Sequence, residues 1–229
     1  MKTLRLDLFQ ETACYKKPLA FKVGETYPLP PYSTVKGMIH ALIDADTFIP
    51  MRLSVQGTYD SIFIDYQTHY FFKKHDSGEM PIVYDGLNIA VPEQKQITQM
   101  PLYTHQLYNV NLIIHVQAED KVIEEIITAI EKGKSISLGR WEDIVVIKDY
   151  KTVDLRAVEE GTTKKPAYIP IDLLMKGELY VPYRLNWKYD IVQNVRKWEK
   201  IAVGYVQPGV EIEEEIFVDE YDDLVFFHQ

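Results

Sequence analysis

The sequence predicts an α+β protein whose main part is a ferredoxin-like, RRM-like palm of order β-α-β-β-α-β. Two observations lead to this prediction. Residues 1–150 contain two helix patterns, each flanked by strand patterns. An aromatic stretch with a turn signal separates the two halves and predicts an inserted β-hairpin, or thumb, at about residues 66–85. Residues 151–229 have mixed strand character, so we expect a small, mostly β C-terminal region with an acidic end.

The first half opens with a strand, because leucines alternate with charged residues over positions 4–8. Three prolines follow, and Ser33 then occupies the position of a helix N-cap. We expect this helix to end near Asp46 and a second strand to begin around Leu53. The apolar stripe of the helix consists of Val35, Met38, Ile39 and Leu42.

The predicted hairpin begins at residues 61–74, which are rich in Ile, Phe and Tyr. A turn is predicted over 75–79, and 82–84 are expected to return as its partner strand. Residues 92–105 are polar and contain two prolines, so we expect a loop there. Strict alternation over 108–116 then gives the clearest strand in the chain.

The second half contains a helix that Asp120 is expected to cap and Gly133 to end. A strand over residues 144–147 follows. The apolar stripe of this helix consists of Ile123, Ile126, Ile127 and Ile130.

The net charge of −9 at first argues against nucleic acid, but the charge is unevenly placed. Eight acidic residues and no lysine or arginine follow Lys200, so the rest of the chain is close to neutral. The charge therefore neither excludes RNA nor indicates it. The acidic end is interpreted either as a solvated edge or as a surface for docking a protein.

A single cysteine, Cys14, excludes an internal disulfide and a cysteine-based zinc site. No apolar run is long enough to span a bilayer, and the N-terminus runs directly into a strand pattern rather than a signal peptide. We therefore expect a cytoplasmic protein with no membrane partner. The six histidines lack metal-ligand spacing and no catalytic motif is present, so we predict no catalytic set, metal or cofactor.

Cations next to glycines and aromatic residues are the remaining chemical signal. Single-stranded RNA is held by phosphate contacts and stacking surfaces, which such residues provide. Lys36 and His40 are an i, i+4 pair near a helix N-terminus, which favours anions. Residues 73–75 lie at the predicted hairpin tip, where lysines also serve as edge-strand protection. In residues 139–141, Arg140 could instead brace the loop through a carboxylate and Trp141 could be a core residue.

Two segments resemble motifs of the CRISPR-associated Cas-five family. Residues 30–39, Pro-Pro-Tyr-Ser-Thr-Val-Lys-Gly-Met-Ile, resemble the Pro-x-Ser-x-x-Gly start of its first helix. Residues 135–142, Ser-Ile-Ser-Leu-Gly-Arg-Trp-Glu, are similar to its Leu-Gly-x-Arg/Trp-Glu loop, and 14–18 are similar too. The resemblance covers roughly residues 1–150 and is closest to the type I-B branch. Together the residue chemistry and the resemblance predict RNA contacts by Lys16, Lys17, Ser33, Lys36, Gly37, His40, Lys73, Lys74, His75, Gly139, Arg140 and Trp141.

The resemblance implies a palm with a thumb hairpin that caps the 5′ handle of the crRNA in a Cascade complex. It also implies contacts with the large subunit and a backbone subunit, and with target DNA only indirectly. In the type I-C branch the same family cuts precursor crRNA with a tyrosine and a lysine–histidine pair. Here residues 41–44 contain no tyrosine and no histidine follows Lys121, so we expect a non-catalytic subunit in antiviral defence.

Two alternatives stay open at this stage. The first is a metal-independent endoribonuclease, in which His40 or His75 would be the base. Its cation would be Lys36, Lys74 or Lys121. The second alternative is a protein-only adaptor that never touches RNA, which the acidic total favours.

Overall fold

The computed structural model describes residues 2–20, 23–72, 97–175 and 177–228. The predicted turn and return strand of the hairpin, and with them Lys73, Lys74 and His75, lie outside the described residues. Neither α-helix in these ranges has the length and hydrophobicity needed to cross a membrane.

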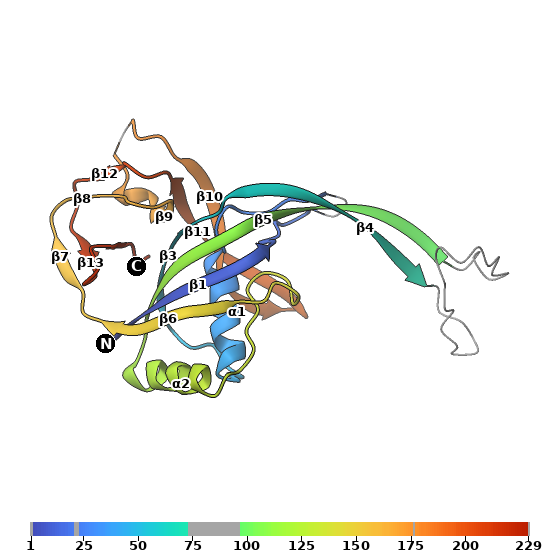
Figure 1. Ribbon diagram of the computed structural model, residues 1–229, viewed down its shortest axis with the longest axis horizontal. Coiled ribbons are helices and arrows are strands. Elements are labelled where there is room, and N and C mark those ends of the chain that lie inside the picture. Colours follow the sequence, from blue (N-terminus) through green and yellow to red (C-terminus); the bar gives the residue numbers. More distant parts are fainter. Residues whose placement is uncertain (1, 21–22, 73–96, 176, 229) are drawn as a thin grey trace.

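Most of the described strands belong to one nine-stranded sheet (Figure 1). Its strands are β1 (Thr3–Ala13), β2 (Val23–Gly24), β3 (Arg52–Thr58), β4 (Ser61–Phe72), β5 (Ile97–Gln117), β6 (Val146–Val153), β9 (Ala167–Pro170), β10 (Val181–Val192) and β11 (Val195–Val206). The main path runs β10-β11-β9-β3-β5-β1-β6, and β2 and β4 also pair with β5.

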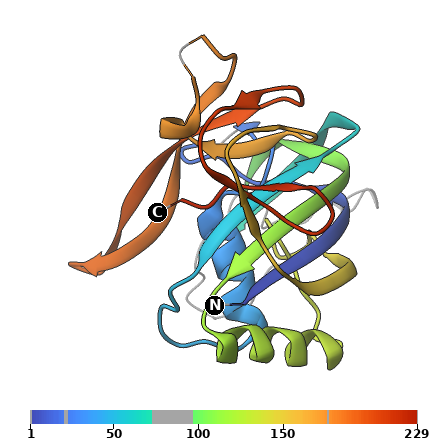
Figure 2. The ribbon, with the colours of Figure 1, turned by 90° about the vertical axis from the view of Figure 1, so that its left-hand side faces the viewer.

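Two helices connect strands β1, β3, β5 and β6 of this path, so the predicted α+β class is confirmed. Helix α1 (Tyr32–Leu42) lies between β1 and β3 in the chain, and α2 (Asp120–Glu131) lies between β5 and β6. Strand β1 pairs antiparallel with both β5 and β6, and β5 pairs antiparallel with β3. Both helices pack on the same face of the sheet, as Figure 2 shows.

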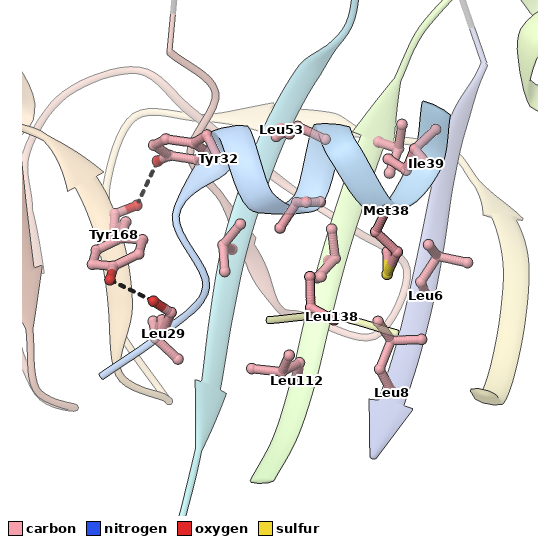
Figure 3. Close-up of a cluster of buried hydrophobic side chains, with 14 of the residues drawn as sticks. Leu6, Leu8, Leu29, Tyr32, Met38, Ile39, Leu53, Leu112, Leu138 and Tyr168 are labelled. Atoms are coloured by element: carbon pink, nitrogen blue, oxygen red, sulfur yellow. Dashed lines mark hydrogen bonds between the residues drawn. The ribbon is translucent and has the colours of Figure 1, made fainter. Parts of the chain in front are cut away.

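The core lies between this sheet face and the helices (Figure 3). The alternation predicted for residues 4–8 is confirmed, because Leu6 and Leu8 are buried against α1 while intervening positions face the other side. A buried tyrosine ties the C-terminal half of the chain to this core. The Tyr168 hydroxyl donates to the Leu29 carbonyl at 2.7 Å, and the Tyr32 hydroxyl donates to the Tyr168 carbonyl at 3.5 Å.

The helix ends differ in part from those predicted. Helix α1 begins at Tyr32 with Pro31 as its N-cap and has no side-chain cap, so the assignment of Ser33 as N-cap was wrong. It ends at Leu42 rather than Asp46, because Asp44 takes a positive φ of 52°. The N-cap of α2 is Glu119, which makes no side-chain cap hydrogen bond, so the assignment of Asp120 as the cap was wrong; Asp120 lies in the first turn.

Gly133 ends the α2 region as predicted. Its φ is +69°, in the left-handed region that favours glycine. Its N–H donates to the Ile130 carbonyl at 2.9 Å, which closes the end of the helix.

The projecting hairpin pairs β4 with the first half of β5, and Figure 1 shows it extending away from the body. The pairing runs from Ser61 opposite Tyr108 to Phe72 opposite Ile97. The predicted loop over 92–105 was therefore wrong at 97–105, because these residues belong to the strand that pairs with 61–72. A polar composition is compatible with a strand here, because a two-stranded projection exposes both faces to solvent.

The C-terminal residues extend the same sheet and also cover part of its second face. Strands β9, β10 and β11 continue the sheet beyond β3, and the predicted boundary at residue 150 falls within β6. Further short strands in this region are β7 (Arg156–Val158), β8 (Gly161–Thr162), β12 (Glu211–Ile212), β13 (Ile216–Val218) and β14 (Leu224–Val225).

Two acids of the C-terminal stretch are structural. Arg5 of β1 donates through Nη1 to Asp219 and Asp223, and His115 Nε2 lies 3.0 Å from the Asp219 carboxylate. Burial acts to raise the pKa of Asp219, but hydrogen bonds from His115, the Asp223 backbone and Arg5 outweigh it and lower the pKa. These ion pairs fasten the acidic end to the face of β1 and β5 opposite the helices.

Gly57 of β3 provides a test of the packing between β3 and β5. A Cβ added there would overlap the Asn111 carbonyl oxygen and come within 2.8 Å of Leu112 Cδ2. We expect Gly57→Ala to lower the free energy of unfolding by about 1–3 kcal/mol, as overpacking does. The matched control is Gly37→Ala on α1, where an added Cβ meets nothing within 4 Å. It should raise the stability by up to about 1 kcal/mol, through helix propensity. Urea denaturation measures the free energy of unfolding of both variants. Equal effects would contradict the register of β3 against β5.

Candidate nucleic-acid interface

The predicted RNA-contacting residues that the structure describes fall into two groups. Ser33, Lys36, Gly37 and His40 lie on α1 and line one cavity of about 430 Å³. The second group adjoins the end of β1 and consists of Lys16, Lys17, Gly139, Arg140 and Trp141.

The cavity lies between α1, the loop that follows it, and the hairpin formed by β10 and β11. This hairpin turns at Gln193 and Asn194, which both have positive φ, 50° and 60°, as a tight two-residue turn requires. The register shifts between Asn186 and Lys188, so Trp187 lies at a bulge. Bulges redirect side chains, and this one places Trp187 against α1.

Lys36 is the most unusual residue of the cavity. It is 5% exposed, and its Nζ has no hydrogen-bond partner among the described residues. Its Nζ lies 3.0 Å from the ring centroid of Trp187 and 5.2 Å from that of Phe48, so aromatic faces are its main neighbours. Burial, and then the charge of Lys188, lowers the pKa of Lys36 to about 7, which Glu199 partly opposes.

His40 is held by two hydrogen bonds within the chain. Its Nδ1 lies 2.7 Å from the Lys36 carbonyl, and its Nε2 accepts the Ile49 N–H at 3.0 Å. Since a carbonyl only accepts, Nδ1 carries the proton and the ring is neutral. The ring stacks on Phe48, with 6.2 Å between centroids, so His40 orders the loop that closes one side of the cavity.

Sequence reasoning missed the aromatic half of this cavity. Trp198 and Tyr189 contact each other edge to face, with 4.9 Å between centroids, and Arg196 lies 4.6 Å from the Tyr189 centroid. Aromatic residues interleaved with lysine and arginine over 187–198 were the available signal. About 150 residues separate this segment from α1, so only the tertiary structure brings them together. The missed lining residues are Phe48, Trp187, Lys188, Tyr189 and Trp198.

The second group is built around a buried carboxylate, Asp143. Asp143 Oδ2 accepts the N–H of Cys14 at 3.0 Å and that of Arg140 at 2.8 Å. Gly139 has φ +113°, and a Cβ there would come within 2.7 Å of the same oxygen. The glycine is therefore required by the protein's own packing.

Arg140 pairs with two carboxylates of its own loop. Its Nη2 lies 2.7 Å from Asp143 Oδ1, and its Nη1 lies 2.9 Å from Glu142 Oε1. Burial acts to lower the pKa of Arg140, but the hydrogen bonds and charge of Asp143 raise it overall. This is the arrangement of a loop brace, and contact of Arg140 with RNA stays a prediction.

The other members of the second group are more accessible. Trp141 is 85% exposed, so the alternative that it belongs to the core was wrong. Lys16 is exposed, whereas Lys17 Nζ pairs with Glu25 at 3.1 Å. Lys16 and Trp141 are therefore the members of this group with free surface.

Among the described residues no cluster of three or more His, Cys, Asp or Glu side chains could hold a metal ion.

The pKa of Lys36 predicts a specific pH dependence of stability. An unfolded lysine has a pKa of about 10.4, whereas the folded value is about 7. Between these values the unfolded state binds more protons, so stability should rise with pH and the destabilisation should be largest below pH 7. We expect Lys36→Met to be more stable than the wild type near neutral pH, with a difference that shrinks towards high pH. Thermal melts across this range measure it, and a difference independent of pH would contradict the assignment.

The brace role of Arg140 predicts the effect of a conservative change. Lysine cannot reproduce the paired contacts with Asp143, so Arg140→Lys should lower the free energy of unfolding by about 1–3 kcal/mol. The matched control is Arg156→Lys, whose pair with Asp222 is 65% and 67% exposed and should contribute within about 0.5 kcal/mol. Equal melting temperatures for the two variants would contradict the structural role of Arg140.

Two solved CRISPR proteins are similar to this chain in fold. A chain of a CRISPR RNA-guided surveillance complex has the same fold with a TM-score of 0.59, at 15% sequence identity, and 92% of this chain and 91% of that chain are covered. A crystal structure of a CRISPR protein from Archaeoglobus fulgidus gives a TM-score of 0.54 at 11% identity, with 100% of both chains covered. No curated protein matches the sequence.

A family model with the description CRISPR-associated protein (Cas_Cas5) matches residues 3–194. This match extends from the first residue of β1 to the turn between β10 and β11, and so includes both helices and the projecting hairpin. The chain therefore belongs to the CRISPR-associated Cas_Cas5 family.

Proposed function

We propose that this protein is a non-catalytic subunit of a CRISPR effector complex and that it binds the 5′ handle of the crRNA. Its family membership over residues 3–194 carries the proposal. A structural neighbour from a CRISPR RNA-guided surveillance complex supports it. The described surface adds a chemical reason, because exposed lysine and aromatic side chains suit single-stranded RNA.

The strand arrangement supports a ferredoxin-like palm within this proposal. The order β6-β1-β5-β3, with α1 and α2 on one face, corresponds to two β-α-β units in the split arrangement. The hairpin of β4 and β5 would then be the thumb. The type I-B branch remains our assignment of subtype, on the motifs at residues 30–39 and 135–142.

Apolar side chains on the hairpin support docking to other subunits of the complex, the large subunit and a backbone subunit. Ile62, Ile64 and Tyr66 alternate along β4 and therefore share one face, and they are 50%, 61% and 59% exposed. Exposed apolar surface of this kind is typical of a chain that is buried in an assembly. Contact with target DNA would then be indirect, and such a subunit would act in the cytoplasm.

The endoribonuclease alternative finds less support in the geometry. Both ring nitrogens of His40 have partners within the chain, so His40 is a poor general base. The Lys121 side chain is 85% exposed and pairs with Glu125 on the same helix. The adaptor alternative rests on acidity, and two of the acids concerned, Asp219 and Asp223, are in internal ion pairs.

Binding to repeat RNA in EDTA tests the proposal. We expect the purified chain to retain labelled repeat RNA of its own locus without cutting it. Lys16→Glu should weaken binding and reduce the slope of log K against log salt by about 0.7 per lost phosphate contact. The matched control is Lys164→Glu, another exposed lysine in a loop, which should change neither quantity. Cleavage products would favour the enzyme instead, and no retention would favour the adaptor.

A further inference from the structure

We propose that the cavity between α1 and the hairpin of β10 and β11 binds one unstacked nucleotide of the RNA, with its phosphate on Lys36 and its base on the aromatic wall. This inference rests on the proposed RNA-binding function and assigns it a specific subsite. The cavity of about 430 Å³ falls within the range of about 300–1,000 Å³ usual for small-ligand sites. A second cavity of about 240 Å³ shares Lys36, Phe48, Trp187 and Lys188 with it.

The first argument is the Lys36 ammonium, which has no hydrogen-bond acceptor in the part of the chain that the structure describes. A buried amine without an acceptor is costly, and this one lines the cavity instead of reaching bulk solvent. A phosphate oxygen would provide the missing acceptor. Lys188 lines the same cavity and adds a second positive charge, and Ser33 in the first turn of α1 adds a hydroxyl at the end of the helix that favours anions.

The aromatic wall is the second argument, and it favours a nucleotide over a carboxylate ligand. Trp187, Tyr189 and Trp198 come from two adjacent strands, and Phe48 faces them from the loop after α1. A carboxylate uses no such surface, whereas a base stacks on it with about 1–3 kcal/mol per base. The bulge at Trp187 indicates that the strand is adapted to present this ring to α1.

Gly37 is the third argument, because it keeps the floor of the cavity open. It lies in the middle of α1, where glycine lowers stability relative to alanine, and a Cβ would meet nothing within 4 Å. Two acids, Asp46 and Asp190, also line the cavity. They repel a phosphate and can accept hydrogen bonds from a sugar hydroxyl or a base amino group, which fixes the direction in which a nucleotide enters.

Binding should be coupled to protonation of Lys36. The pKa of this amine is about 7, so at about pH 8 it is largely neutral, and an adjacent phosphate raises its pKa. Nucleotide binding at this pH should therefore take up close to one proton. The titratable and charged groups that surround Lys36 are His40, Asp46, Arg52, Lys188, Asp190, Glu199 and His228.

Calorimetric titration of the full chain with the four ribonucleoside 5′-monophosphates tests the subsite. Titrations in HEPES and in Tris at about pH 8 give the number of protons taken up from the difference in apparent enthalpy. We expect the wild type to bind at least one of the nucleotides with proton uptake. Lys36→Met should lose about tenfold or more in affinity and lose the uptake. The matched control Lys164→Met, at an exposed loop lysine, should keep both.

The remaining outcomes separate this inference from the proposed function. If repeat RNA binds Lys36→Met and the wild type equally while no nucleotide binds the wild type, the subsite is wrong and the RNA-binding function stands. If nucleotides bind but repeat RNA does not, the subsite stands and the handle-binding function is wrong. If a glutamate-rich peptide displaces the bound nucleotide at a concentration lower than that of the nucleotide, the cavity belongs to a protein partner. This result would overturn the inference.

Discussion

The pairing of one long strand, β5, determines the shape of this protein. Its second half pairs with β1 on one side and β3 on the other, within the main sheet. Its first half pairs with β4 and projects from the body. Asn109, with φ 55°, lies at the transition, between the pairs Gln10–Val110 and Thr12–Tyr108, which keep the same register. The body of the sheet and the projecting hairpin are therefore joined through one strand, which fixes their relative direction.

The C-terminal part of the chain depends on the same central strands. Strand β9 pairs with β3 and carries β11 and β10, so the hairpin beside α1 is positioned by the sheet. On the opposite face, Asp219 and Asp223 bind Arg5 of β1. Two of the eight acids after Lys200 therefore bind the chain's own sheet, so the acidity of this stretch is partly structural.

The two groups of predicted RNA-contacting residues differ in how far the chain's own residues satisfy their polar groups. At Gly139 the close approach of Asp143 accounts for the glycine, and at Arg140 hydrogen bonds to Asp143 account for most of the guanidinium. Around Lys36, the chain supplies aromatic rings but no acceptor among the described residues. A motif that resembles a family signature can therefore be structural at one position and open to a ligand at another, and the hydrogen-bond partners distinguish the two.

The sequence alone determined the elements whose signal is local. Alternation over residues 4–8 and 108–116, the two apolar helix stripes and Gly133 correspond to observed strands, helices and a helix end, because these depend on residues close in the chain. Sequence reasoning also brought Ser33, Lys36, Gly37 and His40 together, since they share one helix. Only the tertiary structure decided that β4 pairs with residues 97–108 and that Trp187 and Trp198 face Lys36. Both results depend on contacts between segments far apart in the chain, for which strand register and a bulge, rather than local composition, are decisive.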